Sequence, residues 1–321
     1  MRTNAGVSAV IPVYNSAATL GELTDRLRST LSELGRDYEL ILVNDGSDDA
    51  SWERIVELAA ADERVRGLNL MRNYGQHNAL LAGIRAARHG VIVTLDDDLQ
   101  NPPEEIPKLL AKLDEGFDVV YGSAETPAFG LLRNAGTAMT KLALGWAIGS
   151  DIAGKVSAYR AFRTDLRDAF ADYDAPYVSI DVLLSWGTTR FGSVPVEHRE
   201  RTEGSSSYGF LRLATHALNV MTGFSTRPLR IASLIGLAFT LFGIAVLAIV
   251  LITYAVEGGS VPGFPFLASV IAIFSGAQLL TLGIIGEYLA RMHMRVMDRP
   301  PFTVREETGA ESREEVGAAR S

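Results

Sequence analysis

Three consecutive aspartates, Asp96, Asp97 and Asp98, follow a β-branched apolar run in the sequence VIVTLDDDLQ of residues 91–100. Like charges this close raise one another's pKa unless a positive group lies among them. In an extended segment, side chains two residues apart share a face, so Asp96, Asp98 and Gln100 can point together while Asp97 faces away. Their oxygen atoms suit a hard divalent cation, Mg²⁺ or Mn²⁺. We therefore predict Asp96, Asp98 and Gln100 as ligands of such a cation.

Polar clusters also end the other strands that the sequence predicts. Apolar runs at about 7–14, 38–45, 65–71 and 90–97 alternate with helical patterns at about 19–34, 50–61 and 77–87, which is typical of a mainly parallel α/β sheet. Ligands bind such sheets beyond the carboxyl ends of the strands. The clusters found there are Tyr14-Asn15, Asn44-Asp45-Gly46-Ser47, Arg72-Asn73-Tyr74-Gly75 and the three aspartates. A solvated acidic loop is the alternative, and the convergence of four clusters disfavours it. A diphosphate ester bound there would need a cation beside the carboxylates.

The segment after the aspartates contains Asn101-Pro102-Pro103, which predicts a turn. Glu104 and Glu105 then fall in the first turn of a helix, where acidic residues suit the helix dipole. We interpret these two glutamates as helix-start residues rather than as metal ligands.

Composition excludes several classes of protein. A net charge of −8 argues against nucleic acid as a partner, since phosphate-binding proteins normally carry a basic balance or patch. The absence of cysteine excludes disulfides and thiolate metal sites and leaves carboxylates, histidines and water as metal ligands. The N-terminal residues MRTNAGVSAVIPVY have no long apolar core, so we do not expect a signal peptide there.

Two long runs without charge lie near the C-terminus, at residues 231–256 and 258–286. Each exceeds the roughly 20 residues that cross a hydrocarbon core, so we predict transmembrane helices at about 231–256 and 264–288. The alternative is a pair of buried helices in a soluble core. Arginines flank the pair on both sides and are absent from the connecting loop, which places both ends in the cytoplasm. They are Arg212, Arg227 and Arg230 before the first run and Arg291, Arg295 and Arg299 after the second.

These observations divide the chain into four parts. Residues 1–207 form a cytoplasmic α/β domain, and residues 208–228 read as an amphipathic helix in the membrane interface, with an ordinary surface helix as the alternative. The two transmembrane helices occupy 229–290, and 291–321 is a cytoplasmic tail that we expect to be largely disordered. The protein is predicted to be a multi-pass protein of the cytoplasmic membrane.

Several motifs resemble the family 2 glycosyltransferases of GT-A fold. They are VIPVYN, VNDGSDD, LMRNYGQHNALLAG and LDDDLQNPPEEIPKLLAKLDEGFDVVYG, followed by VPVEHRERTEGSSSYGFLRL, FSTRPLR and GAQLLTLGIIGEYLARMH. The resemblance covers nearly the whole chain. It is nearest to the branch that transfers sugars to polyprenyl phosphates, which includes undecaprenyl-phosphate aminoarabinose (formamido) transferases and dolichyl-phosphate mannose synthases.

This resemblance implies an inverting transfer from a nucleotide-diphospho-sugar to a lipid monophosphate, with Mg²⁺ or Mn²⁺ as cofactor. It places the base and ribose at Pro12, Tyr14, Asp45, Gly75 and Gln76, and the metal-diphosphate at Asp96, Asp98 and Gln100. We add Asn15 and Asn73, from the strand-end clusters, as candidates for substrate binding. Arg133, Arg199 and Arg201 fall near phosphate-binding positions, although Arg199 and Arg201 could instead attract anionic lipid headgroups.

The chain departs from the family pattern at several positions. Ser16, Ala124 and Ser207 stand where relatives carry a glutamate, an arginine and a lysine. The register that holds the family's proposed base aspartate reaches Gly154, upstream of RAFR at residues 160–163. Asp151 and Asp181 are the remaining candidates for a base, each with a structural or helix-start role as the alternative, and Asp98 is a catalytic candidate through the cation.

We therefore expect a membrane glycosyltransferase that uses polyprenyl phosphate as acceptor. The alternatives are a sugar transferase with another lipid acceptor, such as diacylglycerol, and a non-catalytic partner that binds nucleotide sugars or helps lipid-linked sugars cross the bilayer. The expected partners are the nucleotide-sugar donor, the polyprenyl phosphate acceptor and membrane lipid, without nucleic acid. Assembly into a homo-oligomer is left open.

Overall fold

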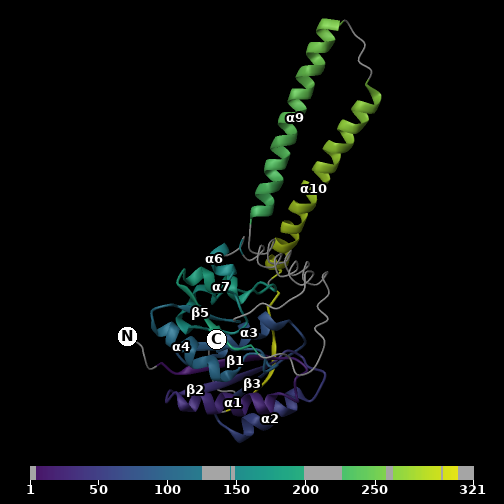
Figure 1. Cartoon of the computed structure of the whole chain (residues 1–321). Coiled ribbons are helices and arrows are strands. Elements are labelled where there is room, and N and C mark those ends of the chain that lie inside the picture. The colour runs from purple at the N-terminus through teal and green to yellow at the C-terminus, as the bar shows by residue number, and fades with distance from the viewer. Residues whose placement is uncertain are drawn as a thin grey trace.

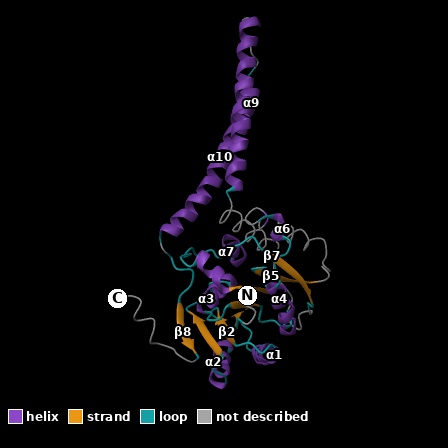
Figure 2. Ribbon diagram, turned by 90° about the vertical axis from the view of Figure 1, so that its left-hand side faces the viewer, coloured by secondary structure: helices purple, strands orange, loops and turns teal. Residues whose placement is uncertain are grey.

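The computed structural model describes residues 5–124, 145, 149–198, 226–257, 263–297 and 299–309. An α/β domain forms one end of the molecule, and two long helices project away from it side by side (Figure 1). The remaining helices pack around the sheet of the α/β domain (Figures 1 and 2).

Within the described residues the sheet has eight strands, in the order β7-β5-β6-β4-β1-β2-β3-β8. Neighbours are parallel in the pairs β1–β2, β2–β3, β1–β4 and β5–β7, and antiparallel in β4–β6, β5–β6 and β3–β8. The strands are β1 Val7–Val13, β2 Tyr38–Asn44, β3 Val65–Leu70, β4 Val91–Thr94, β5 Val119–Ala124, β6 Arg160–Arg163, β7 Phe191–Val196 and β8 Val304–Thr308. The prediction of a mainly parallel α/β sheet is confirmed.

Helices cover both faces of the central strands, which explains why every residue of β1 and β2 is buried. Successive side chains of β1 point to opposite faces, and Val7, Ala9 and Ile11 pack on the side of α1 (Leu20–Glu33) and α4 (Ile106–Asp114). Val10 packs on the other side, against α3 (Gln76–Ala86) and the core that includes α7 (Ile180–Gly187). The helix α2 (Ser51–Ala61) belongs to the first face.

One glycine brings α3 close to the sheet. A Cβ atom at Gly83 would lie 2.3 Å from a methyl group of Val10, so only glycine permits this approach of helix and strand. The N-terminus of α3 is thereby held near the carboxyl ends of the central strands.

The strand order reverses beside β1, because β2 lies on one side of it and β4 on the other. Such a switch point opens a crevice at the carboxyl ends of the two strands that diverge from it, where α/β proteins bind ligands. The loop after β1 and the three aspartates after β4 both lie at the carboxyl ends of the strands that border this switch point.

Shorter elements complete the domain. The 3-10 helix η1 (Pro103–Glu105) starts at the last residue of the predicted turn and has Glu104 and Glu105 in its first turn, as the sequence predicts. The other short elements are α6 (Ser150–Ala153) and the 3-10 helix η2 (Thr164–Phe170).

The two projecting helices are α9 (Arg227–Glu257) and α10 (Phe264–Val296), and they contain both predicted spans. Phe239 of α9 meets Phe274 of α10 edge to face, with 5.6 Å between ring centroids. Among the described residues, both helices are long and apolar enough to cross a membrane, and large apolar side chains such as Leu234 (64% exposed) and Leu279 (70% exposed) are uncovered. Neither helix is buried in the described part of this chain, which does not fit the alternative of two buried helices in a soluble core.

The segment after α10 differs from the expectation of a largely disordered tail over 291–321. The helix continues to Val296, and Val304–Thr308 then forms β8, which pairs antiparallel with β3 at the edge of the sheet (Figure 2). The strand β3, with which it pairs, lies more than two hundred residues earlier in the chain, so a local sequence pattern does not predict this strand. Residues 310–321, and 208–225 of the predicted interfacial helix, lie outside the described residues.

Candidate active site

Asp45, at the end of β2, joins two of the strand-end loops. Its buried carboxylate accepts the backbone N–H groups of Tyr74 at 2.7 Å and Gly75 at 2.8 Å. Gly75 has φ +96°, a conformation that side chains with a Cβ rarely adopt. Removal from water raises the pKa of Asp45, and the two N–H donors and the charge of Arg72 oppose that increase. The loop at 72–75 is therefore fixed against the end of β2.

The loop after β1 is bound to two other loops. Asp97 accepts a hydrogen bond from the backbone N–H of Tyr14 at 3.1 Å, which connects β1 to the aspartate cluster. Asn15, with φ +54°, accepts the N–H of Asp48 at 2.8 Å, and its own N–H is bonded to Ser47 Oγ at 3.0 Å. Pro12 is buried within β1, and the Tyr14 side chain is exposed at the site.

Asp96 faces the N-terminus of α3. Gln76 Nε2 donates to its Oδ1 at 2.6 Å, so the loops after β3 and β4 also meet. Burial and the neighbouring carboxylates of Asp98 and Asp97 raise the pKa of Asp96 to about 6. A group of carboxylates in this state is suited to a cation, which would relieve their mutual repulsion.

The backbone at the aspartates differs from the extended segment on which the sequence prediction was based. The strand β4 ends at Thr94, Leu99 has φ +59°, and Asp98 Oδ1 accepts the N–H of Gln100 at 3.2 Å. The residues after Asp96 form a turn, so alternation along a strand is the wrong reason for grouping Asp96, Asp98 and Gln100. Asp97 does point elsewhere, toward Tyr14.

The described residues contain no group of three or more His, Asp or Glu side chains arranged to hold a metal ion. The carboxylates of Asp96 and Asp98 interact with each other, and Gln100 is tied to Asp98 through its backbone N–H. Such a partial set fits a hard cation that takes its other ligands from water and substrate phosphates, as Mg²⁺ commonly does.

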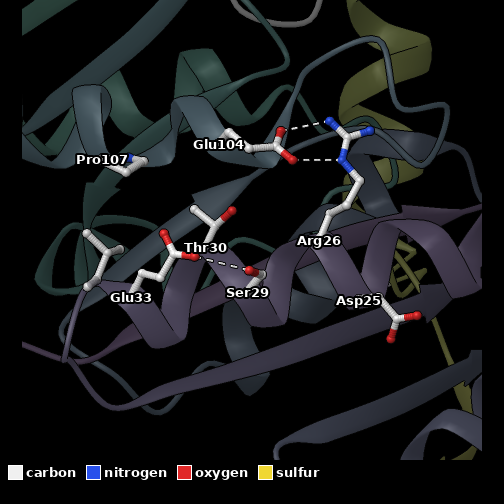
Figure 3. A pocket seen from close by; sticks show the side chains of 8 residues that line it. Asp25, Arg26, Ser29, Thr30, Glu33, Glu104 and Pro107 are labelled. Atoms are coloured by element: carbon white, nitrogen blue, oxygen red, sulfur yellow. Dashed lines mark hydrogen bonds and ion pairs between the residues drawn. The ribbon is translucent and has the colours of Figure 1, made fainter.

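Glu104 and Glu105 are engaged elsewhere. Glu104 forms a two-pronged ion pair with Arg26 of α1, at 2.8 and 2.7 Å, and Figure 3 shows the two side chains facing each other. Glu105 pairs with Lys108 at 2.6 Å. A hollow of about 530 Å³ beside Arg26 and Glu104 contains none of the predicted site residues (Figure 3), and we assign it no role.

Asp181, one candidate for a general base, lies in the core. It is 4% exposed, forms an ion pair with Arg160 and accepts the hydroxyl of Tyr121 at 2.9 Å. A base must reach the acceptor, and this carboxylate is enclosed in the core, with its Oδ1 bound by both Arg160 and Tyr121. The geometry therefore supports the structural alternative for Asp181.

Arg160 is the residue whose importance the sequence did not reveal. Strand register places it opposite Thr94, at the end of β4, and its charge opposes the increase in the pKa of Asp96. The RAFR motif was visible, but only the antiparallel pairing of β6 with β4 brings its first arginine to the aspartates.

The remaining candidates are placed less fully. Asn73 is exposed in the loop that leads from β3 to Gly75. Asp151 lies in α6, and Gly154 follows that helix, while the side chain of Asp151 lies outside the described part of the structure. Arg133, Arg199, Arg201 and Ser207 also lie outside the described residues.

The mainly parallel sheet thus carries carboxylates and loop N–H groups at its switch point, where α/β domains bind ligands. Residues 8–139 match the model of glycosyl transferase family 2. The chain is 38% identical over 305 residues to the undecaprenyl-phosphate 4-deoxy-4-formamido-L-arabinose transferase of Shewanella sediminis, covering 94% of this chain and 92% of the relative. The chain therefore belongs to glycosyl transferase family 2, and it is a glycosyltransferase.

Solved structures share the fold. Glucosyl-3-phosphoglycerate synthase from Mycobacterium tuberculosis, in complex with Mn²⁺, UDP-glucose and phosphoglyceric acid, superposes with a TM-score of 0.51 at 18% identity, covering 68% of this chain and 79% of that chain. The same enzyme with Mn²⁺, UDP and phosphoglyceric acid gives a TM-score of 0.50 at 18% identity, covering 68% and 78%. At this identity the likeness establishes the GT-A-type fold alone.

Proposed function

We propose that the protein transfers a sugar from a nucleotide-diphospho-sugar to a polyprenyl phosphate at the cytoplasmic face of the membrane, with inversion at the anomeric carbon. The observation that carries this proposal is the joining of four strand-end loops into one site by the contacts of Asp45, Asp97 and Gln76. The same chain carries two exposed apolar helices of membrane-spanning length. The name of the Shewanella relative supports the lipid phosphate as acceptor.

The donor would occupy the switch point. The loop residues Tyr14, Asn15, Asn73, Gly75 and Gln76, with Pro12 and Asp45 behind them, would hold the base and ribose. Asp96, Asp98 and Gln100 would hold a divalent cation, Mg²⁺ or Mn²⁺, which when bound neutralises charge on the departing nucleoside diphosphate. The Mn²⁺ complexes of the structural neighbours agree with this choice.

The acceptor phosphate is already ionised at neutral pH, so the reaction needs little help from a general base. The larger demand is stabilisation of the leaving diphosphate. In this scheme Asp181 holds Arg160 in place, and Arg160 supplies positive charge beside the aspartates. Arg133, Arg199 and Arg201 remain our candidates for binding phosphate.

The membrane helices would concentrate a water-insoluble acceptor in two dimensions and bring its phosphate to the interface. The arginines Arg227 and Arg230 at the start of α9 and Arg291 near the end of α10 support a cytoplasmic position for the α/β domain.

The test uses the full chain reconstituted in lipid bilayers. Nucleotide sugars, including a nucleotide-linked 4-deoxy-4-formamido-L-arabinose, are paired with undecaprenyl phosphate or diacylglycerol, with Mn²⁺, Mg²⁺ or a chelator. We expect cation-dependent transfer to undecaprenyl phosphate and an anomeric configuration opposite to that of the donor. Transfer to diacylglycerol alone, or retention of configuration, would overturn the proposal, and the reaction without protein is the blank.

A further inference from the structure

Asn78 lies in the first turn of α3 and makes contacts that the donor site itself does not require. Its side chain is buried, with 7% exposed, and Nδ2 lies within hydrogen-bond distance of three backbone carbonyls. These are Tyr74 O at 3.0 Å, Pro176 O at 3.2 Å and Pro301 O at 2.9 Å. Because an amide nitrogen carries two hydrogens, the three acceptors share them.

The three carbonyls come from three distant parts of the chain. Tyr74 belongs to the loop at 72–75, Pro176 precedes α7, and Pro301 lies in residues 299–303, which lead from α10 back to β8 and which we call the return segment. Asn78 and Pro301 are 223 residues apart in sequence. One buried amide therefore connects the loop at 72–75, which we call the donor loop, with the return segment.

Other contacts fasten the return segment to the same region. Met71, at the start of the loop after β3, donates its N–H to Thr303 O at 2.9 Å and accepts from Arg305 at 3.0 Å through its own carbonyl. The guanidinium carbon of Arg85 lies over the ring of Phe302, 5.6 Å from the ring centroid. The pairing of β3 with β8 shifts register at Asn69 and Leu70, where β3 gives way to the loop.

The end of α10 is docked on the segment that contains Pro176. The guanidinium of Arg291 lies over the ring of Tyr177, with 4.9 Å to the centroid. The pair of helices α9 and α10, which we call the membrane hairpin, thus contacts the α/β domain at Tyr177 and through the return segment.

The loop at 72–75 is held from two sides. Asp45 binds the N–H groups of Tyr74 and Gly75, and Asn78 binds the carbonyl of Tyr74. A hollow of about 180 Å³, lined by Arg72, Tyr177 and Arg299 among others, remains between loop and return segment. Close packing does not fill all of that side, and there the hydrogen bonds of Asn78 and Met71 hold the loop and its start in place.

We infer that Asn78 is a positioning residue for the nucleotide-sugar donor, and that the return segment couples the membrane hairpin to the donor loop through it. This inference rests on the proposed function, because it takes the loop at 72–75 as part of the donor site. In this proposal Asn78 acts on the donor through Tyr74 and Gly75, to whose carbonyls it is hydrogen-bonded, and not by a contact of its own.

The first test replaces Asn78 by aspartate in the full chain, because a carboxylate of similar size cannot donate to the three carbonyls. The KM for the donor should rise about tenfold, the effect of losing buried hydrogen bonds at a binding loop, while kcat and the acceptor KM change less than about twofold. Ser8→Ala is the control, since Ser8 is also buried but bonds Glu39 at the end of β1 that lies away from the site. That variant should lose thermal stability and keep the donor KM.

The second test approaches from the other side of the contact. A chain that ends after Met297 lacks the return segment and β8, whereas a chain that ends after Gly309 keeps both. We expect faster amide hydrogen exchange at residues 72–76 in the shorter chain and in Asn78→Asp, and wild-type exchange in the longer one. Weaker binding of UDP or GDP should accompany the faster exchange.

The outcomes separate the two proposals. Unchanged exchange at 72–76 together with an unchanged donor KM in Asn78→Asp overturns the positioning role. Equal behaviour of the two shortened chains overturns the coupling through the return segment. A wild-type protein that transfers no sugar while these variants still release the loop refutes the proposed function and retains the coupling.

Discussion

The carboxylate of Asp97 accepts a hydrogen bond from the backbone N–H of Tyr14, with 3.1 Å between Oδ2 and the nitrogen. Thr19, just before α1, donates to the backbone carbonyl of Asp97 at 2.8 Å. The middle aspartate of the cluster thus fastens the loop after β4 to the loop after β1. Its neighbour Asp96 is turned toward Gln76 instead, so adjacent aspartates have different tasks.

This division predicts different effects of neutralising each aspartate. Asp96→Asn and Asp98→Asn should each lower cation-dependent transfer by at least about a hundredfold, because charge on the leaving diphosphate is no longer balanced. Asp97→Asn should be mild, within several-fold, since an amide oxygen can still accept the Tyr14 N–H. Steady-state rates at several Mn²⁺ concentrations measure this.

Asp97→Ala is the matched control for that comparison, because it removes the acceptor as well as the charge. It should raise the donor KM and lower thermal stability by about 0.5–1.5 kcal/mol, the net contribution of a typical hydrogen bond. Metal-dependent transfer that survives in Asp98→Asn would contradict the assignment of the cation ligands.

The buried ion pair of Arg160 and Asp181 gives a second prediction. Asp181→Asn leaves the guanidinium without its counter-charge and should destabilise the fold by about 3–5 kcal/mol. A double variant, Arg160→Met with Asp181→Leu, removes both charges and should recover much of the stability. Thermal unfolding measures both. If Asp181→Asn instead keeps its melting temperature and loses only turnover, Asp181 acts as a base and the structural role is wrong.

The sequence predicted the central part of the fold because its signals there are local. The four strands β1 to β4 and the helices α1 to α3 begin and end within a few residues of the ranges expected from apolar runs and helical patterns. The polar clusters after those strands meet as expected, because parallel strands deliver their carboxyl ends to one edge.

What the sequence did not reveal depends on contacts between distant residues. From sequence Asp181 was a candidate base with a structural or helix-start role as the alternative, and only the folded chain shows its ion pair with Arg160. The strand β8 is a short polar run whose partner β3 lies at the other end of the domain in sequence. We expected residues 96–100 to be extended, but they form a turn in which Leu99 has a left-handed backbone conformation. Glycine usually signals such a conformation in a sequence, and there is no glycine at this position.

The third prediction concerns the α/β domain without its membrane helices. A fragment of residues 1–228 lacks β8, and it exposes the edge of β3 that β8 covers. The same fragment with residues 299–309 attached through a flexible linker should be more soluble and should bind nucleoside diphosphate more tightly. Both should transfer poorly to a long-chain acceptor in vesicles, because the acceptor is no longer concentrated at the site.

Gel filtration and nucleotide binding compare the two fragments, and transfer to undecaprenyl phosphate in detergent-free vesicles tests the role of the helices. Full transfer by either fragment would show that the spans are dispensable for acceptor delivery. Identical solubility and nucleotide affinity would show that β8 adds nothing to the domain.

The fourth prediction separates phosphate binding from general membrane attraction at Arg199 and Arg201. Attraction to anionic headgroups depends on charge alone, at about 1 kcal/mol for each basic residue, and tolerates lysine. A phosphate clamp uses the planar guanidinium fork, which lysine cannot reproduce. Arg201→Lys should therefore leave binding to anionic vesicles almost unchanged and lower turnover about tenfold, the effect of one charge-assisted hydrogen bond.

Arg190→Lys is the control with unchanged turnover, because Arg190 is exposed and its ion pair with Asp118 is long, at 3.7 Å. Full turnover with lysine at both positions would make this stretch a membrane-facing charge patch and leave the acceptor phosphate to Arg133 or another group.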